Sequence, residues 1–122
     1  HRIQIYGTLI LPLDISLSPR FIYQTGSNWT RTVRAPVAGS PTINIQPSGS
    51  SRVPPQIDLD LRLEKIFSFA EKMRLGFYLD VFNIFNRGVE TSVISLVTSP
   101  NFGKATLVCD PRYIRVGARF FF

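Results

Sequence analysis

The sequence predicts an all-β protein: an antiparallel meander of about five long transmembrane strands that forms an open section of a large outer-membrane β-barrel. Three observations predict it. Five segments alternate apolar and polar residues with the period of two that marks a strand with two different faces. The links between these segments are alternately short and long. No stretch approaches the roughly 18 consecutive apolar residues that a membrane-spanning helix needs.

The first two segments predict an opening hairpin. One face of the first carries Ile3, Ile5, Leu9 and Leu11, and the other carries Arg2, Gln4, Tyr6 and Thr8. The second runs from about Asp14 to Gln24 and sets Ile15, Leu17, Phe21 and Tyr23 against Asp14, Ser16, Ser18, Arg20 and Gln24. Pro19 weakens the centre of the second strand, because proline cannot donate a hydrogen bond to the ladder.

The third segment alternates most regularly. Its apolar residues are Ile57, Leu59, Leu61 and Leu63, and its charged residues are Asp58, Asp60, Arg62 and Glu64. Four consecutive charged positions on one face cannot lie in a dry soluble core without extensive pairing. Such a face can line the polar lumen of a barrel.

The fourth segment admits two interpretations. As a strand it places Met73, Leu75, Phe77, Leu79 and Val81 opposite Arg74, Gly76, Tyr78 and Asp80. As a helix it would align Met73, Phe77, Val81 and Phe85 along one stripe. We favour the strand, because Gly76 in a helix interior would cost about 1 kcal/mol relative to alanine.

The fifth segment places Ile114, Val116, Ala118, Phe120 and Phe122 opposite Tyr113, Arg115, Gly117, Arg119 and Phe121. From Arg112 to Phe122 a tilted strand would span about 25 Å vertically, which matches the apolar band of an outer-membrane barrel. With the strands before it, this one completes a predicted lumen face that carries Asp58, Asp60, Arg62, Glu64, Arg74, Asp80, Arg115 and Arg119. We expect these charges to pair with one another or to contact a plug domain, with a substrate path as the alternative.

The links support the same topology. They are short around Pro12 and Leu13, long from Thr25 to Gln56, short from Ser68 to Lys72, and long from Arg87 to Pro111. A transmembrane barrel has short periplasmic turns and long external loops, so 25–56 and 87–111 are predicted to be external. Glycine and proline are frequent in the first long link, which predicts an irregular loop that contains Trp29.

The composition excludes several function classes. The net charge is +6, but the basic residues are scattered, so we expect no nucleic-acid binding and instead expect loop cations to meet anionic lipopolysaccharide. Cys109 is the only cysteine, which excludes an internal disulfide and a cysteine metal site. His1 is the only histidine, so a catalytic triad has no base, and neither a catalytic residue, a cofactor nor a metal is expected. We predict a protein that is not an enzyme.

The segment Asp80-Val-Phe-Asn-Ile-Phe-Asn86 follows the regular strand from Ile57 to Glu64, and Phe102-Gly103 and the run from Pro111 to Phe122 come after it. Together these segments resemble the carboxy-terminal end of TonB-dependent outer-membrane receptors. The resemblance covers nearly the whole chain and is strongest from Ile57 onward. It implies that residues 1–122 are a fragment, the C-terminal part of such a barrel, and we expect this barrel in the outer membrane of a bacterium.

That resemblance implies a barrel of about 22 strands around an amino-terminal plug, driven by an inner-membrane TonB complex. Substrates in the family include iron chelates, cobalamin, oligosaccharides and peptides. The implied partners are outer-membrane lipid and lipopolysaccharide, the barrel-assembly machinery, and the remaining strands and plug of the same protein. Contact with TonB would run through an N-terminal part that lies outside this sequence.

Two motifs carry specific expectations. The resemblance implies a barrel-insertion signal at Ile114, Val116, Ala118, Phe120 and Phe122, although an alternating apolar strand can end any β protein. A strand-end motif comprises Asp80, Phe82, Asn83, Phe85 and Asn86. We expect Asn83 and Asn86 to cap the strand and shape the turn, with ligand contact as the alternative.

Two other classes of protein remain as alternatives. A TonB-independent porin-like or adhesin barrel would have the same strands without a plug. A soluble β-sandwich binding domain would use the same alternation but bury its apolar face against a second sheet.

Overall fold

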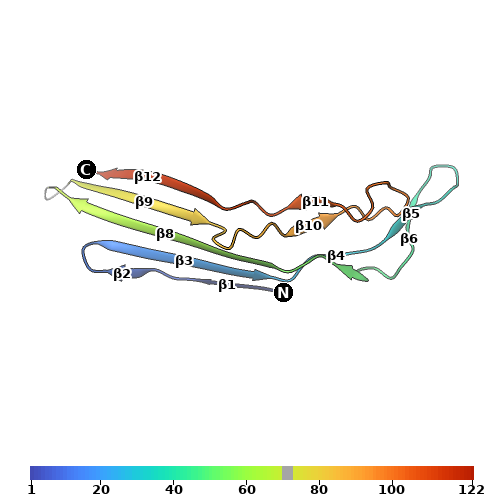
Figure 1. Ribbon diagram of the computed structural model, residues 1–122, viewed down its shortest axis with the longest axis horizontal. Coiled ribbons are helices and arrows are strands. Elements are labelled where there is room, and N and C mark those ends of the chain that lie inside the picture. The colour runs from blue at the N-terminus through green and yellow to red at the C-terminus, as the bar shows by residue number, and fades with distance from the viewer. Residues whose placement is uncertain (70–72) are drawn as a thin grey trace. The chain divides into compact units, whose positions relative to one another are not determined.

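The computed structural model describes residues 1–69 and 73–122, and these fold into strands and connecting segments (Figure 1). Across those two ranges no residue is helical, and no helix is present that could cross a membrane. The all-β, antiparallel prediction is confirmed. The chain divides into two compact units. One contains 1–23, 57–87 and 110–122, and the other contains 24–56 and 88–109.

The first unit is built on a single sheet. Its strands are β1 (Arg2–Tyr6), β2 (Leu9–Leu11), β3 (Ile15–Gln24), β8 (Gln56–Ser68), β9 (Arg74–Phe82) and β12 (Tyr113–Phe121). They lie in the order β1-β3-β8-β9-β12, with β2 also paired to β3, so the spatial order follows the chain order. In Figure 1 the arrows of β3, β8, β9 and β12 alternate in direction, as in a meander. Each of the five alternating segments therefore contributes to this sheet.

Ladder register decides which side chains share a face. Arg62 on β8 lies opposite Asp80 on β9, and Asp80 lies opposite Arg115 on β12. One step along the ladder, Leu61 lies opposite Val81, which lies opposite Ile114. Because side chains alternate between the two faces, charged residues gather on one face and aliphatic residues on the other. Two residues near the end of β8 are exceptions: Lys65 lies on the apolar face opposite Phe77, and Ile66 lies on the charged face opposite Gly76.

Pro19 lies within β3, but the interruption opposite it falls in the partner strand, between β1 and β2. Strand β3 continues through Pro19, whereas the first predicted segment is divided into β1 and β2 by Gly7 and Thr8. The Gly7 amide still donates to the Pro19 carbonyl at 3.3 Å. Proline lacks an N–H, so it cannot return the second bond of that pair, and the ladder breaks there.

The segment with two interpretations is the strand β9, and its helical alternative is wrong. Strand β8 continues to Ser68, four residues beyond the predicted Glu64. The short link predicted from Ser68 to Lys72 lies partly outside the described residues, which omit 70–72. On its flanks the Phe69 amide donates to the Met73 carbonyl at 3.1 Å.

The second unit corrects the prediction of a wholly irregular first loop. It contains three two-stranded sheets. Their strands are β4 (Asn28–Trp29) with β7 (Ser51–Arg52), β5 (Thr32–Arg34) with β6 (Thr42–Asn44), and β10 (Glu90–Val93) with β11 (Ala105–Val108). Gly39 and Gly49 take positive φ angles of 84° and 76° between these strands, a conformation that glycine adopts without strain. The glycines and prolines therefore mark turns of short hairpins.

The two long links also pack on each other within this unit. The Thr32 amide donates to the Ser95 carbonyl at 2.9 Å, and the Val97 amide donates to the Thr32 carbonyl at 2.9 Å. The Trp29 ring meets the Phe102 ring edge-on, with the centroids 6.2 Å apart. Residues far apart in sequence thus form one compact body.

Candidate functional site on the charged face

Strand alternation and ladder register bring the eight charged residues of the predicted lumen face onto one face of the sheet. Asp58, Asp60, Arg62 and Glu64 alternate along β8. Asp80 and Arg115 lie in line with Arg62 across the sheet. Arg119 and Arg74 lie further along, opposite Gly76 and Phe121 respectively. The eight residues therefore share one face of the sheet.

Asp80 is the centre of a cluster on this face. It is 2% exposed, and two arginines from the neighbouring strands bind it. Arg62 donates through Nε to Oδ1 at 2.6 Å and through Nη2 to Oδ2 at 3.0 Å. Arg115 donates through Nε and Nη2 to Oδ2 at 2.9 and 2.6 Å. Charge-assisted bonds of this length are among the stronger polar contacts in proteins, so three strands are tied together at one carboxylate.

A second carboxylate extends the cluster toward β3. Asp60 Oδ2 accepts from Nε and Nη2 of Arg20 at 2.9 and 2.5 Å. Its other oxygen, Oδ1, accepts from the backbone amide of Asn83 at 2.9 Å. Asp60 therefore links β3, its own strand and the residue that follows β9.

Aromatic rings support the arginines from the same face. The Arg62 guanidinium carbon lies 5.1 Å from the centroid of the Tyr78 ring, and that of Arg115 lies 5.2 Å from the Phe82 ring. The Phe82 ring stacks on Tyr113 with the centroids 4.5 Å apart. Cation–π contacts of this geometry hold guanidinium groups in a defined orientation.

A hollow of about 290 Å³ opens beside the cluster. Ser18, Arg20, Arg62, Phe82 and Arg115 contribute to its walls, together with both paired aspartates. Sequence alternation placed Arg20 on the polar face of its strand, but only the Arg20–Asp60 pair shows that it belongs with the predicted charged residues.

The strand-end motif lies directly beside this cluster. Asn83 is 7% exposed and has φ of 49°, and its Nδ2 donates to the carbonyls of Asp110 at 2.8 Å and Arg87 at 3.3 Å. Asn86 has the same φ, and its Oδ1 accepts from the Arg112 amide at 3.0 Å. Asparagine tolerates this left-handed conformation better than most residues. Both side chains therefore join the end of β9 to the residues before β12, while Phe85 stays exposed.

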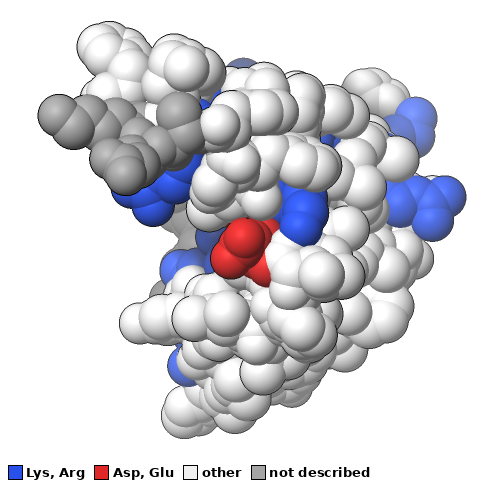
Figure 2. Space-filling model, turned by 90° about the vertical axis from the view of Figure 1, so that its left-hand side faces the viewer, with Lys and Arg blue, Asp and Glu red and all other residues white. Residues whose placement is uncertain are grey.

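Four of the five residues of the predicted insertion signal lie on the opposite, apolar face, while Phe122 follows the end of β12 and is 96% exposed. Ile114, Val116, Ala118 and Phe120 lie opposite Val81, Leu79, Phe77 and Leu75 respectively. Val116 is 73% exposed and Ile114 is 64% exposed. Figure 2 looks at the sheet from the end where β12 finishes. The surface in view is mostly uncharged, with acidic atoms at one place and basic atoms beside them and at several other places.

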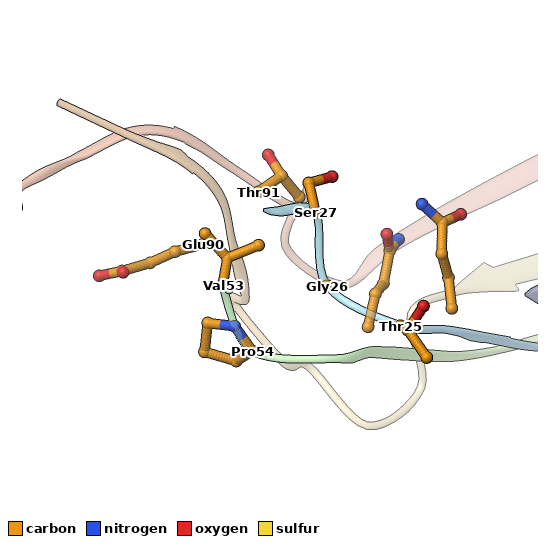
Figure 3. Close-up of a pocket in the computed structure, with 9 residues that line it drawn as sticks. Thr25, Gly26, Ser27, Val53, Pro54, Glu90 and Thr91 are labelled. Atoms are coloured by element: carbon orange, nitrogen blue, oxygen red, sulfur yellow. The ribbon is translucent and has the colours of Figure 1, made fainter. Parts of the chain in front are cut away.

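The second unit contains a smaller cavity of about 40 Å³, lined in part by Gly26, Val53 and Thr91. Gly26 has no room for a side chain, because an added Cβ would lie 1.7 Å from the Val53 carbonyl oxygen. In Figure 3 the Glu90 side chain points away from Thr25 and Gly26. A space of this size holds water rather than an organic ligand.

Residues 1–69 and 73–122 contain no group of three histidine, cysteine or acidic residues that could hold a metal ion. Cys109 is half-buried, and its amide donates to the Val89 carbonyl at 2.9 Å. This backbone hydrogen bond joins Cys109 to the segment just before β10.

Comparison of the chain with protein-family models, with curated proteins and with solved structures found no match.

Proposed function

We propose that this chain forms strands from the C-terminal part of the barrel of a TonB-dependent outer-membrane receptor. Such a receptor takes up a scarce nutrient, for example an iron chelate, cobalamin or an oligosaccharide. The observation that carries the proposal is a sheet with one exposed apolar face and one charged face that contains three ion pairs. Its location would be the bacterial outer membrane, with lipid and lipopolysaccharide around it.

The apolar face of the sheet argues for a lipid environment. Its exposed large side chains come from three neighbouring strands: Leu63, Phe67, Phe77, Leu79, Ile114, Val116 and Phe120. Monomeric soluble proteins rarely leave a contiguous apolar surface of this kind open to water. In a membrane barrel the outward face is apolar and meets hydrocarbon, so the same side chains need no protein cover.

Strand lengths agree with that environment. Strands β9 and β12 each have 9 residues, β3 has 10 and β8 has 13. A tilted strand needs about 9–11 residues to cross the hydrocarbon layer. Four neighbouring strands of the sheet therefore have sufficient length to span it.

The opposite face fits a barrel interior. Asp80 is buried beneath two arginines whose side chains are 40% and 53% exposed. In the proposed barrel this cluster faces the lumen, where water, a plug domain or a ligand can meet the arginines. Pairing within the sheet offsets the cost of burying the carboxylate.

A barrel that works without TonB, of the porin-like or adhesin kind, has the same two faces and is the second candidate. A soluble β-sandwich requires a further sheet over the apolar face. One experiment on the full-length protein distinguishes the receptor from both of these alternatives.

That experiment separates membranes from cells that produce the full-length protein, and then measures uptake of candidate nutrients with and without TonB. We expect the protein in the outer-membrane fraction, heat-modifiable migration in gels, and uptake that requires TonB. Uptake that persists without TonB would indicate the porin-like barrel. Recovery as a soluble monomer would exclude both barrels.

A further inference from the structure

We propose that the hollow beside Asp60 and Asp80 binds a small solute through a carboxylate or phosphate group, held by Arg20, Arg62 and Arg115. The hollow measures about 290 Å³, close to the lower limit of small-molecule sites. The inference rests on the geometry of the charged face, which is the same whether the opposite face meets lipid or protein.

The charge balance of the hollow favours an anion. Three arginines and two aspartates line it, which leaves one positive charge in excess. The side chains of Asp60 and Asp80 are only 13% and 3% exposed, whereas those of Arg20, Arg62 and Arg115 are 48%, 40% and 53% exposed. A solute that enters the hollow therefore meets guanidinium groups far more than carboxylates.

These arginines retain donors for a ligand. Their ion pairs use Nε and Nη2 of each guanidinium, and Nη1 takes part in none of them. A guanidinium carries five N–H donors in a rigid planar fork, which matches the oxygens of a carboxylate or phosphate. Three Nη1 groups from three different strands thus lie outside these ion pairs, on one side of the sheet.

The arginines are also held in place before a ligand arrives. Asp60 and Asp80 fix one side of each guanidinium through the paired bonds. The rings of Tyr78 and Phe82 lie close to Arg62 and Arg115 respectively. Binding to groups that are already ordered costs less conformational entropy than binding to free side chains. Phe82 adds an apolar wall against which the remainder of an organic anion can lie.

The test is isothermal titration calorimetry on the full-length protein, in detergent or in buffer as its fractionation requires. Inorganic phosphate and acetate are the two probes, and sodium chloride at equal ionic strength is the reference. Arg20→Gln removes one guanidinium from the hollow but leaves both ion pairs of Asp80, with Arg62 and Arg115, intact. Arg74→Gln is the matched control, because Arg74 lies on the same face, opposite Phe121, and outside the hollow.

We expect saturable binding of at least one probe above the chloride reference, with equal affinity in the wild type and Arg74→Gln. Arg20→Gln should bind at least about tenfold more weakly, and Arg20→Lys should fall between them, since lysine keeps the charge but loses the fork. Stronger binding of phosphate than of acetate would identify a phosphate-bearing solute, and the reverse order a carboxylate. Either order supports the site.

Two results would overturn the inference. One is the absence of saturable binding for both probes, as would occur if an acidic side chain from another part of the protein filled the hollow. The other is an equal loss of affinity in Arg20→Gln and Arg74→Gln, which would indicate diffuse attraction by the charged face. Failure of the proposed receptor function would change the cellular fractionation but not this comparison of variants.

Discussion

The ring of Tyr78 fills the space that a side chain at Gly117 would occupy. The two residues are direct partners in the ladder between β9 and β12, and a Cβ added to Gly117 would lie 2.3 Å from both Cζ and Oη of Tyr78. The guanidinium of Arg62 lies near the same ring. The glycine therefore allows an aromatic side chain to lie across the neighbouring strand and support the charged cluster.

Gly117→Ala should destabilise the protein by about 1–3 kcal/mol, because the Tyr78 ring must move away from the new methyl group. Urea unfolding of the full-length protein measures this loss. Gly7→Ala is the control, since no atom lies within 4 Å of its added Cβ. In the double variant Tyr78→Ala/Gly117→Ala the cost of the alanine at 117 should largely disappear. Equal losses in Gly117→Ala and Gly7→Ala would contradict the account.

Asp80→Asn should destabilise the sheet by about 2 kcal/mol. Breaking a buried ion pair leaves its partners uncompensated, but Arg62 and Arg115 are partly solvated, which reduces the loss. The same unfolding measurement applies. Glu64→Gln removes one negative charge from the same face, at a residue that makes none of the three ion pairs among the described residues. The prediction fails if both variants lose the same stability.

If the apolar face meets lipid, as proposed, Val116→Arg should reduce the amount of assembled protein in the outer membrane. An arginine near the middle of a lipid-facing strand costs about 2–4 kcal/mol in a barrel. Ile66→Arg introduces the same side chain on the charged face, in line with Gly76 and Arg119. Immunoblots of membrane fractions should show a much larger loss for Val116→Arg. Comparable amounts of the two variants would argue against a lipid-facing role for this surface.

Asn83→Ala should loosen the junction between β9 and the residues before β12. Alanine loses three side-chain bonds, two to the Asp110 and Arg87 carbonyls and one from the Arg87 amide, and is strained at a φ of 49°. Limited trypsin digestion should cut at Arg87 several-fold faster in this variant. Asn83→Gly keeps the backbone conformation and removes only the bonds, so its digestion rate should be intermediate. A rate for Asn83→Ala no higher than that for Asn83→Gly would show that backbone strain contributes nothing.

Much of the main sheet could be predicted from the sequence. Period-two alternation located all five segments, and Gly76 favoured the strand over the helix between Met73 and Val81. The eight charged positions fell on one face, because a strand alternates its side chains whatever its partners are. The second unit could not be predicted in the same way, because the pairing of Thr32 with Ser95 joins residues 63 positions apart.

The sequence by itself therefore determined the class of structure and the division of each strand into a charged and an apolar side, because backbone geometry imposes that alternation locally. Only the tertiary structure decided that Asp80 binds two arginines, that Arg20 joins the cluster, and that Gly117 makes room for Tyr78. Those contacts depend on ladder register. Register is a relation between strands distant in sequence, so no single segment encodes it.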